Sequence, residues 1–130
     1  MDKIITSLQE RKKSPTRLTK NSKLFKTIIA AIQEKKGSHI VSLDLKKIDE
    51  AVADFFILCD AGSNIQVKAI ARNIEEIIER DCEERPYHIE HGDQWTLVDY
   101  VNIVVHIFQH EQRIFYNLES LWEDAPRSEH

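Results

Sequence analysis

The side chains of this chain that could ligate a metal ion are, first of all, its six histidines. His88 and His91 stand three residues apart in a segment that Pro86 makes extended, so on a strand they point to opposite faces and cannot chelate one ion. His106 and His110 have no patterned cysteine or carboxylate beside them to complete a tetrahedral set. We therefore predict no metal site, and we interpret His106 as a histidine of the core or of an interface.

Nucleophilic catalysis has no better support in the sequence. Cys59 lies inside an apolar segment, where burial favours the neutral thiol over the thiolate. Ser63 stands three residues before Gln66, which is the spacing of a helix capping box, so its hydroxyl is already used at a helix start. The sequence has no P-loop, G-x-G-x-x-G or G-x-S-x-G motif. We expect no catalytic residue and no cofactor, and we interpret Cys59 and Cys82 as reduced thiols of a cytoplasmic protein.

Nucleotidyl transfer is the enzymatic alternative. Gly62 and Ser63, at a predicted strand-to-helix turn, resemble the phosphate-binding turn of nucleotidyltransferases, whose chemistry needs two or three carboxylates on Mg²⁺. The D-x-D or D-x-E expected on the next strand is missing, because Glu90 and Asp93 fall in different environments and Asp99 stands at a hairpin turn. We therefore disfavour an enzyme that acts on nucleotides with Mg²⁺, and keep it as the alternative function.

The elements that must position these residues alternate in type. Apolar residues at helical spacing predict helices over 22–36, 64–84 and 113–122. Alternating or continuous apolar runs predict strands over 39–45, 54–60, 86–91, 95–100 and 102–108. The second strand, the long helix and the third strand are typical of a crossover between parallel strands, and the last two strands are typical of a hairpin. We predict an α/β fold of the mixed α+β kind, with a single mixed five-stranded sheet flanked by helices.

Trp95 and the predicted helix 113–122 carry more specific expectations. Trp95 follows the loop 92–94, so we expect it at the rim of the sheet, partly exposed, as a binding anchor; the alternative is that it caps the core. In helix 113–122, Phe115, Leu118 and Trp122 fall at helical spacing, which is more typical of core residues than of contacts.

The charge of the chain is divided along its length. Residues 1–26 carry eight Lys or Arg against two acids, whereas residues 27–130 carry ten against twenty, so the two parts have net charges of +6 and −10. An acidic body binds polyphosphates poorly and suits a basic protein surface, so we expect no specific nucleic acid. No apolar run approaches the roughly 20 residues of a membrane span. Residues 1–20 are predicted to be a basic flexible N-terminal arm, and 21–126 the folded domain.

Several segments together resemble one family. D-F-F-I-L-C-D-A-G-S, W-T-L-V-D-Y, I-V-V-H-I-F and R-I-F-Y-N-L-E-S-L-W, within residues 23–125, are similar to the ribosomal silencing factor family, also called Iojap-like proteins. The resemblance implies a nucleotidyltransferase-like fold without catalytic carboxylates. It also implies a factor that represses translation: it binds a basic protein of the large ribosomal subunit at the subunit interface and blocks subunit joining. The resemblance also allows that the protein forms a homodimer.

The resemblance also carries binding residues onto this chain. The family's contacts with the ribosomal protein correspond to Trp95, Leu97, Asp99, Val105, Arg113 and Tyr116. Arg113 could instead pair with a neighbouring carboxylate. The family usually has glycine and aspartate where this chain has Val101 and Asn102. Because valine resists positive φ, we expect Asn102 to take that conformation.

Overall fold

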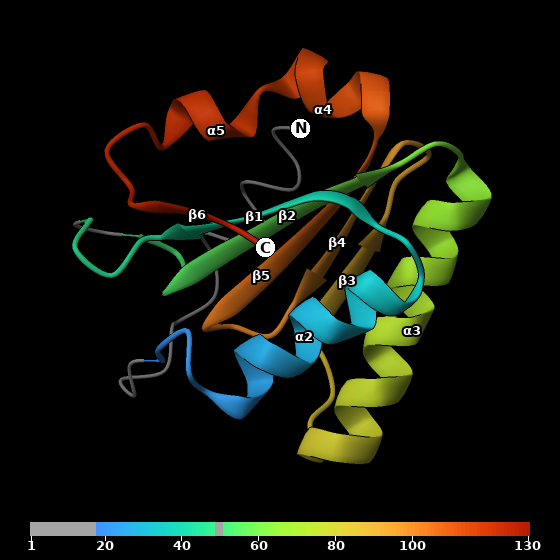
Figure 1. Ribbon diagram of the computed structural model, residues 1–130, viewed down its shortest axis with the longest axis horizontal. Helices are drawn as coiled ribbons and strands as arrows, with labels where there is room; N and C mark the ends of the chain where they lie inside the picture. Colours follow the sequence, from blue (N-terminus) through green and yellow to red (C-terminus); the bar gives the residue numbers. More distant parts are fainter. Residues whose placement is uncertain (1–17, 49–50) are drawn as a thin grey trace.

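Two helices in the first part of the chain pack side by side on one face of a sheet (Figure 1). The structure is a computed structural model that describes residues 18–48 and 51–130. In it, α2 (Lys23–Glu34) begins after Ser22, whose Oγ accepts a hydrogen bond from the Phe25 amide. The longer α3 (Asn64–Cys82) turns its apolar stripe toward α2 and the sheet. None of the described helices is long and apolar enough to cross a membrane.

The start of α3 confirms the predicted capping residue. Ser63 Oγ accepts a hydrogen bond from the Gln66 amide at 3.2 Å. The Gln66 side chain reaches back one residue further than in the usual capping box, because its Oε1 accepts from the Gly62 amide at 3.3 Å. The strand-to-helix turn is therefore closed by this chain's own side chains.

The strands form one mixed sheet in the order β3-β4-β5-β2-β1-β6. Its members are β1 (Ser38–Asp44), β2 (Phe55–Ala61), β3 (His88–His91), β4 (Trp95–Asp99), β5 (Ile103–Gln109) and β6 (Arg127–Glu129). β2 and β5 pair in parallel at the centre, and the other neighbouring strands pair antiparallel. It follows that β3 runs parallel to β2, as predicted for the crossover through α3, although β4 and β5 lie between them.

The mixed sheet confirms the predicted fold class, but it has six strands where the sequence predicted five. The additional strand, β6, consists of Arg127, Ser128 and Glu129, which show no apolar alternation. It forms only because β1 offers an edge on which it can pair. No local pattern in the sequence could indicate it.

Each face of the sheet has its own core. The first lies between the sheet and α2 and α3, and includes Phe55, Val98 and Val105. The second lies on the opposite face, under α4 (His110–Tyr116) and α5 (Leu118–Leu121), and includes Trp95 and Leu97. Because both faces are covered, β2 and β5 are buried along nearly their whole length, as their continuous apolar runs predict.

The predicted helix over 113–122 is two short helices instead. α4 begins three residues earlier, at His110, and ends at Tyr116; the next residue, Asn117, adopts a left-handed conformation with φ 42°. Asparagine tolerates this conformation better than most residues, and the backbone N–H of Asn117 donates to the Arg113 carbonyl to close the turn. The break changes the helical phase, so the apolar residues on its two sides do not lie on one stripe.

The turn between β4 and β5 corrects a further expectation. Val101, not Asn102, has the positive φ, 71°. The Asn102 side chain is fixed instead, since its Nδ2 donates to the buried Asp54 carboxylate at 3.0 Å. The Val101 amide donates to Asp99 Oδ1 at 2.7 Å, which closes the turn around the strained valine.

The predicted basic arm, residues 1–20, lies outside the described residues except for its last three. The Leu18 amide donates to Asp54 Oδ2 at 2.8 Å, and Lys20 Nζ donates to Ser128 Oγ at 2.8 Å. Leu18 also packs against the core on the α2–α3 side. These contacts bind the end of the predicted arm to the domain.

Candidate functional site

The six residues carried over from the family do not form one accessible surface. Five of them are at least nine-tenths buried and the sixth is half-buried; they are Trp95, Leu97, Asp99, Val105 and Arg113, and then Tyr116. Val105 points into the α2–α3 core, whereas Trp95 and Leu97 point into the core of the opposite face. Of the six, Tyr116 is therefore the one that is partly exposed.

Trp95 is a core residue in this structure, which corrects the expectation of a partly exposed tryptophan at the rim. It is 4% exposed, and its indole stacks on Phe108 with ring centroids 4.8 Å apart. Tyr116 of α4 covers it from above at 5.1 Å, and the indole Nε1 donates to His106 Nδ1 at 3.2 Å. The backbone of Trp95 is at the rim, as predicted, but its ring turns inward under α4.

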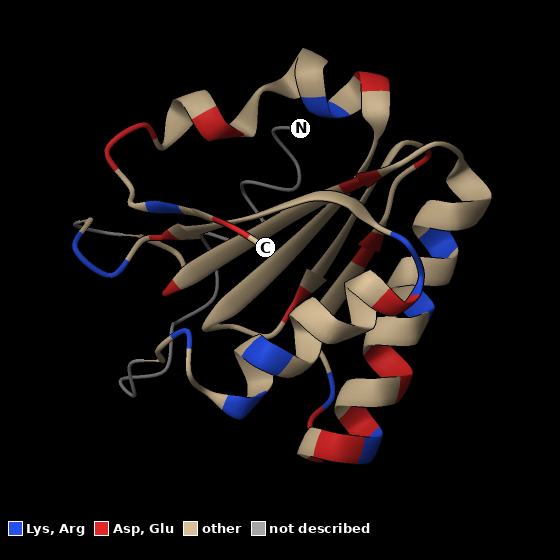
Figure 2. Ribbon diagram, viewed as in Figure 1, with Lys and Arg blue, Asp and Glu red and all other residues tan. Residues whose placement is uncertain are grey.

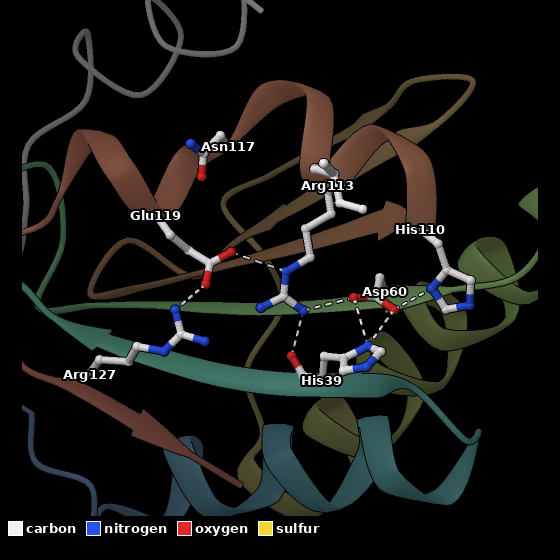
Figure 3. A pocket seen from close by; sticks show the side chains of 8 residues that line it. His39, Asp60, His110, Arg113, Asn117, Glu119 and Arg127 are labelled. Atoms are coloured by element: carbon white, nitrogen blue, oxygen red, sulfur yellow. Dashed lines mark hydrogen bonds and ion pairs between the residues drawn. The ribbon is translucent and has the colours of Figure 1, made fainter.

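Arg113 takes the alternative role, that of a partner for neighbouring carboxylates. Its guanidinium is 2.8 Å from Asp60 Oδ2 and 3.2 Å from Glu119 Oε1 (Figure 3). It also donates to the backbone carbonyl of His39. Because these partners belong to β2, α5 and β1, Arg113 fastens α4 to the end of the sheet.

Three residues that the sequence did not connect meet beside Arg113. Asp60 is buried near the end of β2, and the Nδ1 atoms of His39 and His110 both face its carboxylate (Figure 3). The topology explains the meeting: antiparallel β1 begins where β2 ends, and parallel β5 ends there too. The two histidines are 21 and 50 residues from Asp60, so only the strand pairing could have predicted the cluster.

The surroundings of this cluster form an open cavity of about 550 Å³. The cavity is lined by side chains of both charges and by one apolar side chain: His39, Asp60, His110, Arg113, Ile114, Asn117, Glu119 and Arg127. Arg127 pairs with Glu119, so the ion pairs continue from Asp60 through Arg113 and Glu119 to the edge strand. Such a site can hold a cation at the carboxylate end.

The residues weighed for catalysis are not assembled in the described part of the chain. Burial raises the pKa of the Cys59 thiol well above its ordinary value, which disfavours the thiolate as predicted. Among the described residues, a convergent group of three or more ligating side chains is formed by His39, Asp60 and His110, and not by the carboxylates of a nucleotidyltransferase. Both cysteines are free thiols.

The outer surface of α4 and α5 is apolar and acidic. Ile114, Phe115 and Leu121 are 80%, 77% and 57% exposed. Exposed acids accompany them on the same segment, where Figure 2 shows Asp and Glu in red. We call the whole set the α4–α5 surface: Glu111, Ile114, Phe115, Leu121, Glu123 and Asp124. The expectation of a core position is confirmed for Leu118, which is 3% exposed, and is wrong for Phe115. Trp122 is half-buried, with its ring 5.6 Å from that of Phe56.

Comparison with known proteins gives a consistent result. The family model described as "Ribosomal silencing factor during starvation" matches residues 18–130. The ribosomal silencing factor of Halalkalibacterium halodurans is 36% identical over 110 residues, which cover 84% of this chain and 93% of that protein. The ribosomal silencing factor of Bacillus subtilis is 37% identical over 79% of this chain and 87% of its own length. A crystal structure from Bacillus halodurans superposes with a TM-score of 0.71 at 32% identity, over 85% of this chain and all of that one. The chain belongs to the ribosomal silencing factor family.

Proposed function

We propose that this protein binds the large ribosomal subunit through a basic ribosomal protein at the subunit interface. Bound there, it blocks joining of the small subunit and represses translation in the cytoplasm. Family membership supports the proposal, because the relatives are named ribosomal silencing factors, a regulatory rather than a catalytic role. The acidic body, with its net charge of −10 over residues 27–130, supports a basic partner.

The observation that carries the proposal is the α4–α5 surface. Three large apolar side chains of α4 and α5 stay exposed, and exposed large apolar side chains are typical of protein–protein contacts. Residues 110–125 carry four acids and one base, a net charge of −3, and the base, Arg113, is buried in its own ion pairs. An apolar surface with acidic neighbours suits a partner that is apolar at the contact and basic around it.

The carried-over residues then act mainly from beneath this surface. Trp95 supports Tyr116, whose ring lies 5.1 Å away, and Arg113 fixes α4 to Asp60. Leu97 fills the core beneath α4 and α5, whereas Val105 fills the core on the opposite face of the sheet and Asp99 closes the turn at Val101. In this proposal Tyr116 touches the ribosomal protein, and Trp95, Leu97 and Arg113 hold the surface in shape.

Co-sedimentation with purified ribosomal subunits tests the proposal, combined with light scattering to follow subunit joining. The wild-type protein should sediment with the large subunit alone and inhibit joining. Phe115→Ser should weaken binding roughly thirtyfold, the effect of losing a contact worth about 2 kcal/mol. The matched control is Ile65→Ser, because Ile65 is equally exposed, at 82%, but lies on α3. Unchanged joining at saturating protein would overturn the proposal.

The alternative, an enzyme acting on nucleotides with Mg²⁺, predicts a binding isotherm when nucleoside triphosphate and Mg²⁺ are titrated into the protein. We expect no heat of binding in that calorimetric experiment.

The homodimer stays a separate prediction; pairing through a sheet edge would use β3 or β6, the two outer strands. Sedimentation velocity over a range of concentrations tests it.

A further inference from the structure

We infer that His39, Asp60 and His110 form a binding site for one divalent transition-metal ion of the zinc class. Each residue offers one ligand atom, and the three atoms lie within 4.8 Å of one another. Two imidazole nitrogens and a carboxylate oxygen are a donor set that suits Zn²⁺ and disfavours Mg²⁺. The fourth position of a tetrahedral ion would open into the cavity beside Arg113, where water can occupy it.

The separation between His39 Nδ1 and Asp60 Oδ1 is close to the one that a bound ion requires. Bond lengths of about 2.0–2.2 Å at a tetrahedral ion separate neighbouring ligand atoms by about 3.3–3.6 Å. His39 Nδ1 lies 3.1 Å from Asp60 Oδ1, and His110 Nδ1 is in hydrogen-bonding contact with the same oxygen. The imidazoles are 74% and 48% exposed, so they can move outward by the small amount that the ion needs.

The orientation of the two histidines suits a shared ion. Both rings turn the same nitrogen, Nδ1, toward Asp60 Oδ1, and His39 Nδ1 also lies 3.2 Å from Oδ2. Both imidazole nitrogens therefore face the carboxylate, where they can ligate an ion together with it. When an ion binds, a neutral ring moves its proton from Nδ1 to Nε2, and a protonated ring keeps the proton on Nε2 and releases the one on Nδ1.

The contacts around the carboxylate leave one of its oxygens for the ion. Arg113 Nη1 binds Asp60 Oδ2 at 2.8 Å, which fixes the carboxylate plane as outer-shell partners of metal ligands do. The positive charge of Arg113 is shared with Glu119, which accepts from its Nε at 3.2 Å. Arg113 therefore does not fully neutralise the negative charge of Asp60.

The backbone at His39 is also unusual. Its φ is 50°, a conformation uncommon for residues other than glycine, and the pairing of β1 with β2 shifts register between Ser38 and Val41. An irregularity of this kind redirects a side chain. Here it accompanies the turn of the His39 ring onto Asp60. An ion held at this place would link β1, β2 and the first residue of α4.

Titration of the whole, metal-free chain with Zn²⁺ against a chromogenic chelator tests the site. We expect one equivalent to bind, and Co²⁺ to give the visible absorption of a four-coordinate ion. His110→Gln and His39→Asn, the latter chosen because asparagine tolerates positive φ, should each weaken binding at least tenfold. The matched control, His91→Gln, replaces an exposed histidine of β3 and should bind like the wild type.

Thermal unfolding separates loss of the site from loss of the fold. Zn²⁺ should raise the Tm of the wild type and of His91→Gln, because a ligand bound to the folded state stabilises it. It should leave the Tm of the two site variants unchanged, while their circular dichroism without metal matches the wild type. Wild-type affinity in His39→Asn and His110→Gln, or no binding by the wild type, would overturn the inference. Neither result depends on ribosome binding.

Discussion

Trp95 and His106 share a hydrogen bond inside the protein: the indole Nε1 donates to His106 Nδ1 over 3.2 Å. An Nδ1 that accepts a hydrogen bond carries no proton, so the bond selects the neutral ring protonated on Nε2. Burial acts in the same direction and lowers the pKa of His106 to about 3. The interaction thus requires a neutral histidine throughout the range in which histidine ordinarily titrates.

A pH dependence of stability follows from this pair. Because the pKa of His106 is lower in the folded protein than in the unfolded chain, the unfolded chain binds a proton as the pH falls below about 6.5, and the folded protein does not. This group alone should reduce the free energy of unfolding by about 1 kcal/mol between pH 7 and pH 5.5. Urea unfolding at both pH values checks it. His106→Gln, whose amide oxygen can accept the indole hydrogen, should lose that part of the pH dependence; an equal dependence in both proteins would contradict the prediction.

Replacement of Trp95 should affect the stability of the fold more directly than partner binding. Because the indole is buried among Phe108, Tyr116 and His106, Trp95→Ala should reduce the free energy of unfolding by about 3–5 kcal/mol. Chemical unfolding measures the change. Phe115→Ala is the control, since this ring is 77% exposed and its loss should cost less than about 0.5 kcal/mol. A stable Trp95→Ala protein would restore the earlier expectation of a binding anchor.

The strained turn at Val101 offers a stabilising substitution. Valine at a φ of 71° is unfavourable, whereas glycine adopts this conformation freely. Val101→Gly should therefore increase the free energy of unfolding by about 1 kcal/mol, after allowance for the greater freedom of glycine in the unfolded chain. The Tm should rise by a few degrees. Val101→Ala, which keeps a Cβ at positive φ, should gain less. A lower Tm for Val101→Gly would show that contacts of the valine side chain outweigh the backbone strain.

The buried pair of Arg113 and Asp60 should behave as a unit. Removal of Asp60 leaves the buried Arg113 with Glu119 as its remaining partner, and removal of Arg113 leaves the buried Asp60 with His39 and His110. Because each change removes the main partner of a buried charge, Arg113→Met and Asp60→Asn should each cost about 3–5 kcal/mol. The double variant should cost clearly less than the sum, which unfolding of the four proteins measures as a coupling energy. Arg85→Ala, which breaks an exposed pair with Glu79, serves as the surface control and should change stability little. Additive effects of the two buried substitutions would contradict the prediction.

Local patterns determine what could be predicted from the sequence. The apolar runs of β2 and β5 indicate strands covered on both faces, and the alternation in β4 correctly separates Trp95 and Leu97 from Val98. The inward turn of the Trp95 ring could not be predicted, because Tyr116, which covers it, belongs to another element. The break at Asn117 likewise depends on how α4 and α5 fit over the sheet.

The candidate site shows the same limit more strongly. Nothing near Asp60 in the sequence points to His39 or His110; the three meet because β1 is antiparallel to β2 while β5 is parallel to it. The exposure of Ile114 and Phe115 could not be predicted from the sequence either, because their helical spacing with the buried Leu118 is typical of a core stripe. Periodicity describes one element, whereas a site of this kind is made by the pairing of several.

The order of the strands has a consequence for how the protein reaches this structure. The central strand β2 comes early in the sequence, whereas its parallel neighbour β5 follows only after α3, β3 and β4. The pairing of Phe55 with Ile103 therefore joins two distant segments of the chain. Pairing between such distant segments is slow, because a long loop must close before any contact is gained. Until then, β2 can pair with the preceding strand β1 on one side, but the other edge of its apolar segment F-F-I-L-C-D-A stays open to other chains. Refolding at high protein concentration should therefore lose material to aggregation through β2, and dilution should recover it.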